Sequence, residues 1–180
     1  MLIEKDKSSL FIIDVQEKLV SAMPKPHRFI DNIIKLQKAA NVLEVPITLS
    51  EQYPKGLGVT IDKIRENTKK TEIEVIEKTD FALSINLDSV ELKGGNNIII
   101  CGIEAHVCVL QTAIGLADFD MKVFVVQDAI SSRYEKDYLT ALSRLDKHPN
   151  IQIVSYEMVL FEWLESSNHP EFKTISQLIK

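Results

Sequence analysis

The segment 97–109 constrains the fold most, because it joins a buried strand to a helix through a short turn that carries a cysteine. Residues 98–101 are apolar on both faces, which is typical of a parallel strand covered by two helix layers. After the turn, apolar residues recur at helical spacing between Leu110 and Ala117. Cys108 is therefore predicted to lie at a helix N-terminus, beyond the carboxyl end of a parallel strand, where α/β folds usually bind ligands.

Two interpretations of Cys108 are open at this point. Amide N–H groups and the positive end of the helix dipole favour a thiolate, which would make this side chain a nucleophile. Alternatively, Cys108 is a small buried hydrophobic residue, as most free cysteines are. The other residues at the same edge of the sheet determine which of the two interpretations holds.

Strands and helices alternate along the rest of the chain. Buried strands are predicted at 9–13, 46–50, 73–77, 98–101, 121–126 and 151–154. Helical patterns cover 29–43, 61–67, 86–93, 108–119, 134–145, 156–164 and 172–179, and 51–60 is predicted to be a loop. The alternation predicts an α/β fold, a doubly wound (Rossmann-like) six-stranded parallel sheet with helices on both faces. With no repeat or linker, residues 1–180 are predicted to form a single domain.

Composition excludes several classes of partner. The 21 basic and 26 acidic residues give a net charge of −5 without a basic cluster, so we expect no nucleic-acid partner. Apolar runs fall short of the roughly 20 residues that a membrane span needs, and no cleavable signal precedes the first strand. Two cysteines make no disulfide framework, and a Cys101–Cys108 bridge is poorly motivated, so a cytoplasmic location is expected.

Three ionisable residues follow strands whose carboxyl ends should meet at one edge of the sheet: Asp14, Lys78 and Cys108. A carboxylate, an ammonium and a thiol are the groups that amide or ester cleavage through an acyl-enzyme needs. Taken alone, Asp14 could cap a neighbouring turn and Lys78 could be a solvated lysine at a strand end. The three together favour a hydrolytic site.

Three separated motifs resemble those of the isochorismatase-like cysteine hydrolases, a superfamily that also contains nicotinamidases and other small-amide hydrolases. They are Phe-Ile-Ile-Asp-Val-Gln at 11–16, Glu-Lys-Thr-Asp-Phe at 77–81, and Gly-Ile-Glu-Ala-His-Val-Cys-Val at 102–109. The loop from Glu51 to Gly58 looks like that of a short, uncharacterised branch of the family. The resemblance extends from about residue 8 to 155.

The resemblance implies roles for particular residues. Cys108 would be the nucleophile, Asp14 the general base and acid, and Lys78 the charged third member. A cis peptide between Ile103 and Glu104 would turn the Glu104 amide toward the same oxyanion hole as the Cys108 amide. The resemblance also implies a homo-oligomer, and Asp128 matches a strand-end aspartate that we interpret as structural.

One departure from the family concerns metal binding. Nicotinamidases of this group carry a histidine-bearing metal site in the loop after the second strand, whereas residues 50–58 contain no histidine. The four histidines, His27, His106, His148 and His169, show no ligand spacing, so neither a metal nor a cofactor is expected. In this loop Gln52 and Tyr53 are candidates for substrate binding, or else pack the loop.

Phe81 is a third candidate for substrate binding, because it follows Lys78 closely enough to wall the crevice, or else it belongs to the core. The predicted function is a cysteine hydrolase that cleaves a C–N bond of a small amide or related acyl compound through a thioester. A catalytically idle oligomeric scaffold, and a vinyl-ether hydrolysis of the isochorismatase type, remain as alternatives. A nucleotide-binding redox protein is disfavoured because no G-x-G-x-x-G follows a predicted strand.

Overall fold

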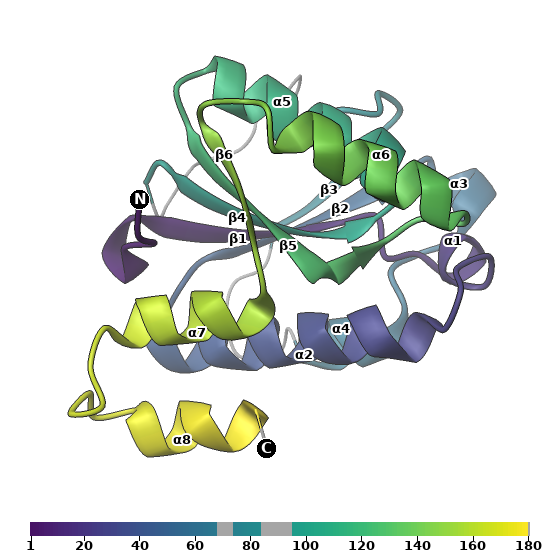
Figure 1. The fold of residues 1–180 in the computed structure, drawn as a ribbon. Helices are drawn as coiled ribbons and strands as arrows, with labels where there is room; N and C mark the ends of the chain where they lie inside the picture. The colour runs from purple at the N-terminus through teal and green to yellow at the C-terminus, as the bar shows by residue number, and fades with distance from the viewer. Residues whose placement is uncertain (68–73, 84–94, 180) are drawn as a thin grey trace.

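The computed structural model describes residues 1–67, 74–83 and 95–179, which form a layered α/β structure around one sheet (Figure 1). The six strands lie in the order β3-β2-β1-β4-β5-β6, and all neighbouring pairs are parallel. The strands are β1 (Ser8–Ile13), β2 (Ile47–Gln52), β3 (Glu74–Lys78), β4 (Asn97–Ile103), β5 (Lys122–Ser131) and β6 (Ile151–Val154). The predicted doubly wound parallel sheet is confirmed.

Helices cover both faces of the sheet, as Figure 1 shows. One layer contains α2 (Pro26–Leu43), α4 (Asp62–Glu66), α7 (Tyr156–Leu164) and α8 (Phe172–Ser176), and the other contains α5 (Leu110–Asp118) and α6 (Glu135–Leu145). Two apolar cores result from the alternation along each strand: in β1, Leu10 and Ile12 pack in one core, and Phe11 and Ile13 in the other. Both faces of the central strands are buried, which explains why their sequences are continuously apolar.

The order of the strands changes direction between β1 and β4, because the chain first adds β2 and β3 on one side of β1 and then returns to its other side. In open α/β sheets this switch point leaves a crevice at the carboxyl ends of the strands. Asp14 follows β1 and Cys108 follows β4, so the two candidate residues flank the switch point.

Several predicted boundaries were wrong. β2 continues through Gln52, into residues predicted to be a loop, and β5 continues through Ser131, beyond the predicted end of the strand at residue 126. Two short helices, α1 (Glu17–Val20) and α3 (Pro54–Leu57), were not predicted, and α2 begins three residues earlier than expected, at Pro26. Proline is favourable there because its fixed φ suits the first helical position. The segment 86–93, predicted to be partly helical, lies outside the described residues.

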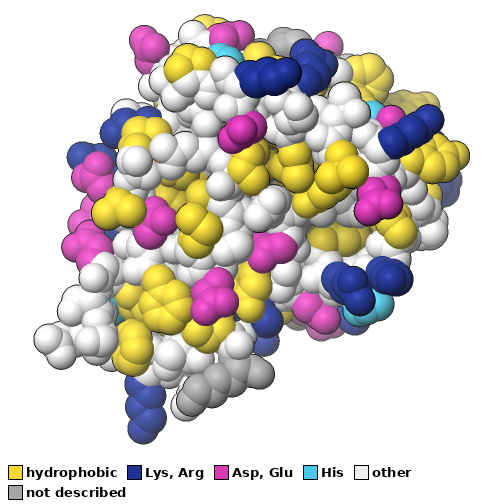
Figure 2. Space-filling view, viewed as in Figure 1, with side chains coloured by type: hydrophobic (Ala, Val, Ile, Leu, Met, Phe, Trp, Pro, Cys, Tyr) yellow, Lys and Arg dark blue, Asp and Glu magenta, His cyan; other side chains and the backbone are white. Residues whose placement is uncertain are grey.

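The face in Figure 2 carries charges of both signs between groups of adjoining hydrophobic side chains. Within the three described ranges, no helix combines the length and the apolar character that crossing a bilayer would require.

Candidate functional site

Asp14 directly follows β1, and its side chain is completely buried. Its backbone has φ +50°, a left-handed conformation that Asp tolerates better than most residues. Both carboxylate oxygens are occupied: Oδ1 accepts a hydrogen bond from Ser50 Oγ at 2.7 Å, and Oδ2 accepts one from Lys78 Nζ at 2.7 Å. These contacts join Asp14 to other side chains and do not indicate the alternative role, in which it caps a neighbouring turn.

Lys78 is the last residue of β3, and its side chain is buried against Asp14. The ammonium also donates to Gln52 Oε1 at 2.7 Å and lies 3.4 and 3.3 Å from the carbonyl oxygens of Asp80 and Phe81. A charged group survives burial only when it is paired and hydrogen-bonded, and both conditions hold here. The interpretation of Lys78 as a solvated lysine is therefore wrong.

Cys108 lies in a π-helical turn, Ala105–Val109, two residues before α5 begins at Leu110, and only 5% of its surface is exposed. Burial and the negative charge of Asp14 raise the pKa of the Cys108 thiol to about 12, whereas Lys78 lowers it. Of the two interpretations of Cys108, its burial thus favours a protonated thiol over a thiolate, although the residue lies in the helical turn that leads directly into α5.

The peptide bond between Ile103 and Glu104 is cis, as the resemblance implied. The Glu104 side chain turns toward the end of β5, where its Oε2 accepts hydrogen bonds from the backbone N and the Nε of Arg133, both at 3.0 Å. Glu104 and Cys108 bracket one turn, so their backbone amides remain the candidates for an oxyanion hole.

The three predicted substrate-binding residues differ in their surroundings. Gln52 is buried and hydrogen-bonded to Lys78, whereas Tyr53 and Phe81 are 55% and 53% exposed. Phe81 is therefore not a core residue. Tyr53 and Lys78 both line a pocket of about 350 Å³, and the side chain of Lys78 is buried.

Sequence reasoning missed two polar residues that hold the site together. Ser50 donates to Asp14, and Gln16 binds the backbone of Gln52 in both directions, with Gln52 N at 2.7 Å and Gln52 O at 3.0 Å. Gln16 lies in the motif at 11–16, but the sequence alone indicates no role for it. The signal was the occurrence of polar residues directly at the ends of apolar strands, where they would otherwise be left unpaired.

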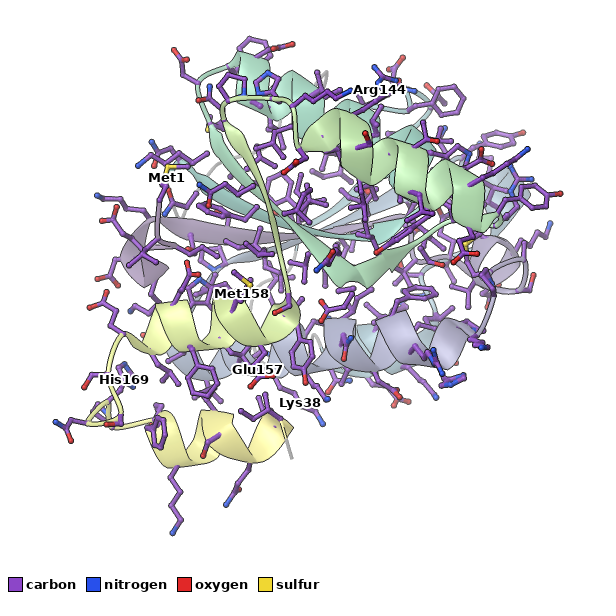
Figure 3. The ribbon with its side chains drawn as sticks, in the orientation of Figure 1. Met1, Lys38, Arg144, Glu157, Met158 and His169 are labelled. Carbon is purple, nitrogen blue, oxygen red and sulfur yellow. The ribbon has the colours of Figure 1, made fainter. Side chains whose placement is uncertain are left out.

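Other predictions concern residues outside this cluster. Asp128 accepts a hydrogen bond from the Tyr156 amide at 2.9 Å, and partial burial raises the pKa of its carboxyl, which agrees with the structural role that we predict for it. Cys101 and Cys108 are both free thiols. Among the described residues no group of three or more His, Cys, Asp or Glu side chains could hold a metal ion. His169, one of the four histidines, lies in the connection between α7 and α8, where Figure 3 labels it.

A larger cavity of about 830 Å³ lies between the N-terminal segment and α7. Leu2, Ile3, Met158 and Phe161 contribute apolar side chains to it, and Figure 3 labels Met158 on α7. None of the candidate site residues lines this cavity, so it is separate from the cluster around Asp14.

Comparison with known proteins identifies the family. The model of the isochorismatase domain matches residues 8–156. The chain belongs to the isochorismatase family of hydrolases. Isochorismatase domain-containing protein 2 of Rattus norvegicus is 32% identical over 177 residues, which cover 97% of this chain and 82% of the relative. The predicted resemblance is thereby confirmed at the level of the family.

Solved structures agree with this membership. The MAR1 ribonuclease structure from Caenorhabditis elegans has a TM-score of 0.93 at 36% identity, and covers 99% of this chain and 92% of that one. The YcaC gene product of Escherichia coli, an octameric hydrolase of unknown specificity, has a TM-score of 0.84 at 20% identity over 98% of this chain and 95% of its own. At that identity, the likeness to the YcaC gene product concerns the fold alone.

Proposed function

We propose that this chain is a cysteine hydrolase that cleaves the C–N bond of a small amide or related acyl compound through a thioester. One observation carries the proposal. The buried Cys108 thiol lies close enough to the buried Asp14–Lys78 ion pair for both of its members to act on the pKa of the thiol. A nucleophile, a base that can take its proton and a cation that stabilises the resulting charge are thus gathered in one desolvated site.

The first half of the reaction forms the acyl-enzyme. As Cys108 Sγ attacks the carbonyl carbon, the thiol proton passes to the Asp14 carboxylate, and the C=O electron pair moves onto oxygen. The amides of Glu104 and Cys108 would stabilise that oxyanion. When the C–N bond breaks, protonated Asp14 returns the proton to the leaving nitrogen, and the amine departs.

The second half hydrolyses the thioester. Asp14, again a carboxylate, takes a proton from a water molecule that attacks the acyl carbon. The C–S bond then breaks, the carboxylic acid product leaves, and Asp14 returns the proton to Cys108 Sγ, which restores the thiol. Lys78 keeps its charge throughout, so it can favour the ionised carboxylate and offset the charge that develops on sulfur.

The substrate class follows from the size and charge of the site. Asp14 and Lys78 neutralise each other, and the Cys108 thiol is neutral at its raised pKa. A charged substrate group buried in this crevice would find no unpaired opposite charge among these three residues, so a neutral amide is favoured. The low exposure of Cys108 further favours a small substrate.

A ribonuclease is the competing function, because the name of the Caenorhabditis elegans relative includes that activity. The net charge of −5 argues against it, since binding an RNA backbone relies on basic side chains. A vinyl-ether hydrolysis of the isochorismatase type would use the same crevice without the thiol. An idle scaffold would need none of the three side chains.

The test is ammonia release from a panel of small neutral amides, including formamide, acetamide and propionamide, by the wild type, Cys108→Ala and Cys101→Ala. We expect activity in the wild type, normal activity in Cys101→Ala, and a loss of at least about 1,000-fold in Cys108→Ala. Full amidase activity in Cys108→Ala would refute the covalent mechanism. RNA cleavage by the wild type that Cys108→Ala retains would favour the competing function.

A further inference from the structure

The Gln52 side chain uses both of its polar ends within the protein. Its Nε2 donates to the carbonyl oxygen of Thr79 at 2.7 Å, its Oε1 accepts from Lys78 Nζ at 2.7 Å, and Gln16 binds both its backbone N and its backbone O. These contacts bind Gln52 to the residues of the site itself, which gives it a second role beside the substrate binding that the sequence suggested.

The position of β2 explains what this second role of Gln52 is. β2 lies between β1, which carries Asp14 at its end, and β3, which ends in Lys78. Side chains two residues apart in a strand point to the same face, so Ser50 and Gln52 lie side by side on β2. Ser50 holds Asp14 Oδ1, and Gln52, which pairs in register with Lys78, holds the ammonium.

From this arrangement we propose that Ser50 and Gln52 are the positioning residues of the site, which fix the Asp14–Lys78 pair from the strand between them. The inference rests on the proposed function and adds to it. Ser50 stabilises the carboxylate by donating to it, and Gln52 stabilises the ammonium by accepting from it. Both are neutral groups, so they hold each charge in place without neutralising it and leave the two charges to act on the thiol.

Each variant should be active over a narrower pH range than the wild type, with the loss on the acid side in one variant and on the alkaline side in the other. Ser50→Ala removes a hydrogen bond to the Asp14 carboxylate, so activity should be lost at a higher pH on the acid side of the pH–activity profile. Gln52→Met removes a hydrogen bond from the Lys78 ammonium, so activity should be lost at a lower pH on the alkaline side. In both variants kcat should fall about tenfold with KM nearly unchanged, because the positioning role acts on the ion pair rather than on the substrate.

The chain offers a matched control for each variant. Ser9, also a buried serine of a central strand, has no hydrogen-bond partner for its Oγ within the described part of the chain. Gln37 is a buried glutamine of α2 that donates to Ile64 O at 3.2 Å, away from the site. Ser9→Ala and Gln37→Met therefore remove the same groups from the core, and both the acid and the alkaline limb of the profile should stay where they are in the wild type.

The experiment measures hydrolysis of p-nitrophenyl acetate from pH 4 to 10 in all four variants, with circular dichroism to check folding. Ser50→Ala removes one atom and keeps the inference testable if Gln52→Met does not fold. A raised KM with unmoved limbs would mean that Gln52 acts only in substrate binding, and shifts of equal size in the controls would mean a general loss of packing; either overturns the inference. If wild-type hydrolysis survives Cys108→Ala, the proposed function fails first. If hydrolysis depends on Cys108 and the limbs do not move, only the positioning role fails.

Discussion

Because Cys108 is protonated at rest, the rate at which it is alkylated does not measure its role in catalysis. Asp14 raises the pKa of the thiol by charge and by hydrogen bonding, whereas Lys78 lowers it by the same two means. Below a pKa of about 12 the thiolate fraction grows tenfold with each pH unit, so alkylation should accelerate steadily from pH 7 to 10. A nucleophile of this kind depends on a base at the moment of attack, rather than on a standing negative charge.

Substituting the two partners of Cys108 should therefore change its alkylation in opposite directions. Asp14→Asn removes the raising effect and lowers the pKa of the thiol, so iodoacetamide should label Cys108 at least about fivefold faster at pH 8, although amide hydrolysis is lost. Lys78→Met removes the lowering effect and should slow labelling. Intact mass with peptide mapping measures both rates, with the fully buried Cys101 as internal reference. Equal changes in both variants would contradict the assignment.

At the scale of elements, the sequence predicted the strands well where burial alone determines them. Strands β1 and β4 are apolar on both faces, so their composition identifies them. The end of β2 escaped prediction because Glu51 and Gln52 are polar, and a buried polar residue is compatible with a strand only if its partners are known. Glu51 Oε1 accepts from the Thr60 amide at 2.7 Å, and that contact is far from evident in the sequence.

The candidate site, like the strands, could be predicted from the sequence only in part. Asp14, Lys78 and Cys108 follow from strand ends and from motifs, because the parallel topology brings those ends together. The protonation state of the thiol did not follow, since it depends on desolvation in three dimensions. The role of Gln52 did not follow either, because the sequence does not distinguish a glutamine in a loop from one at the end of a strand that lies between two others.

Gly102 in β4 provides a prediction at this scale. Its φ of +118° is open to glycine alone, and a Cβ there would lie 2.6 Å from the Ile13 nitrogen and even closer to the Ile13 carbonyl oxygen. Gly102→Ala should lower the free energy of unfolding by at least about 2 kcal/mol, because backbone atoms of β1 cannot yield. Urea unfolding followed by Trp163 fluorescence measures this loss.

Gly56→Ala is the matched control for that substitution. Its Cβ would meet the ring of Tyr53, a half-exposed side chain that can move away, and its φ is not in the left-handed range. The expected loss is below about 1 kcal/mol. If the two alanine variants unfolded at the same urea concentration, the close approach of β1 and β4 at Gly102 would not be the constraint that we describe.

At the scale of the whole molecule, exposed aromatic residues at the carboxyl edge of the sheet favour self-association. Tyr53 and Phe81 are each more than half exposed next to the site, and burial of one such side chain contributes about 1.5–3 kcal/mol. We therefore predict that this chain forms a homo-oligomer in which a second copy covers that edge.

Light scattering coupled to size exclusion should then give a mass that is a multiple of the 20.4 kDa chain. Phe81→Asp should shift that mass toward the monomer, because a carboxylate buried at an interface without a partner is strongly unfavourable. Phe119→Asp is the control: Phe119 is 64% exposed but follows α5 at the opposite, amino-terminal edge of the sheet, so its replacement should leave the mass unchanged. A monomeric wild type would refute self-association. If Phe119→Asp dissociated the oligomer and Phe81→Asp did not, the interface would lie at the amino-terminal edge of the sheet. The site would then be open to solvent in the assembly.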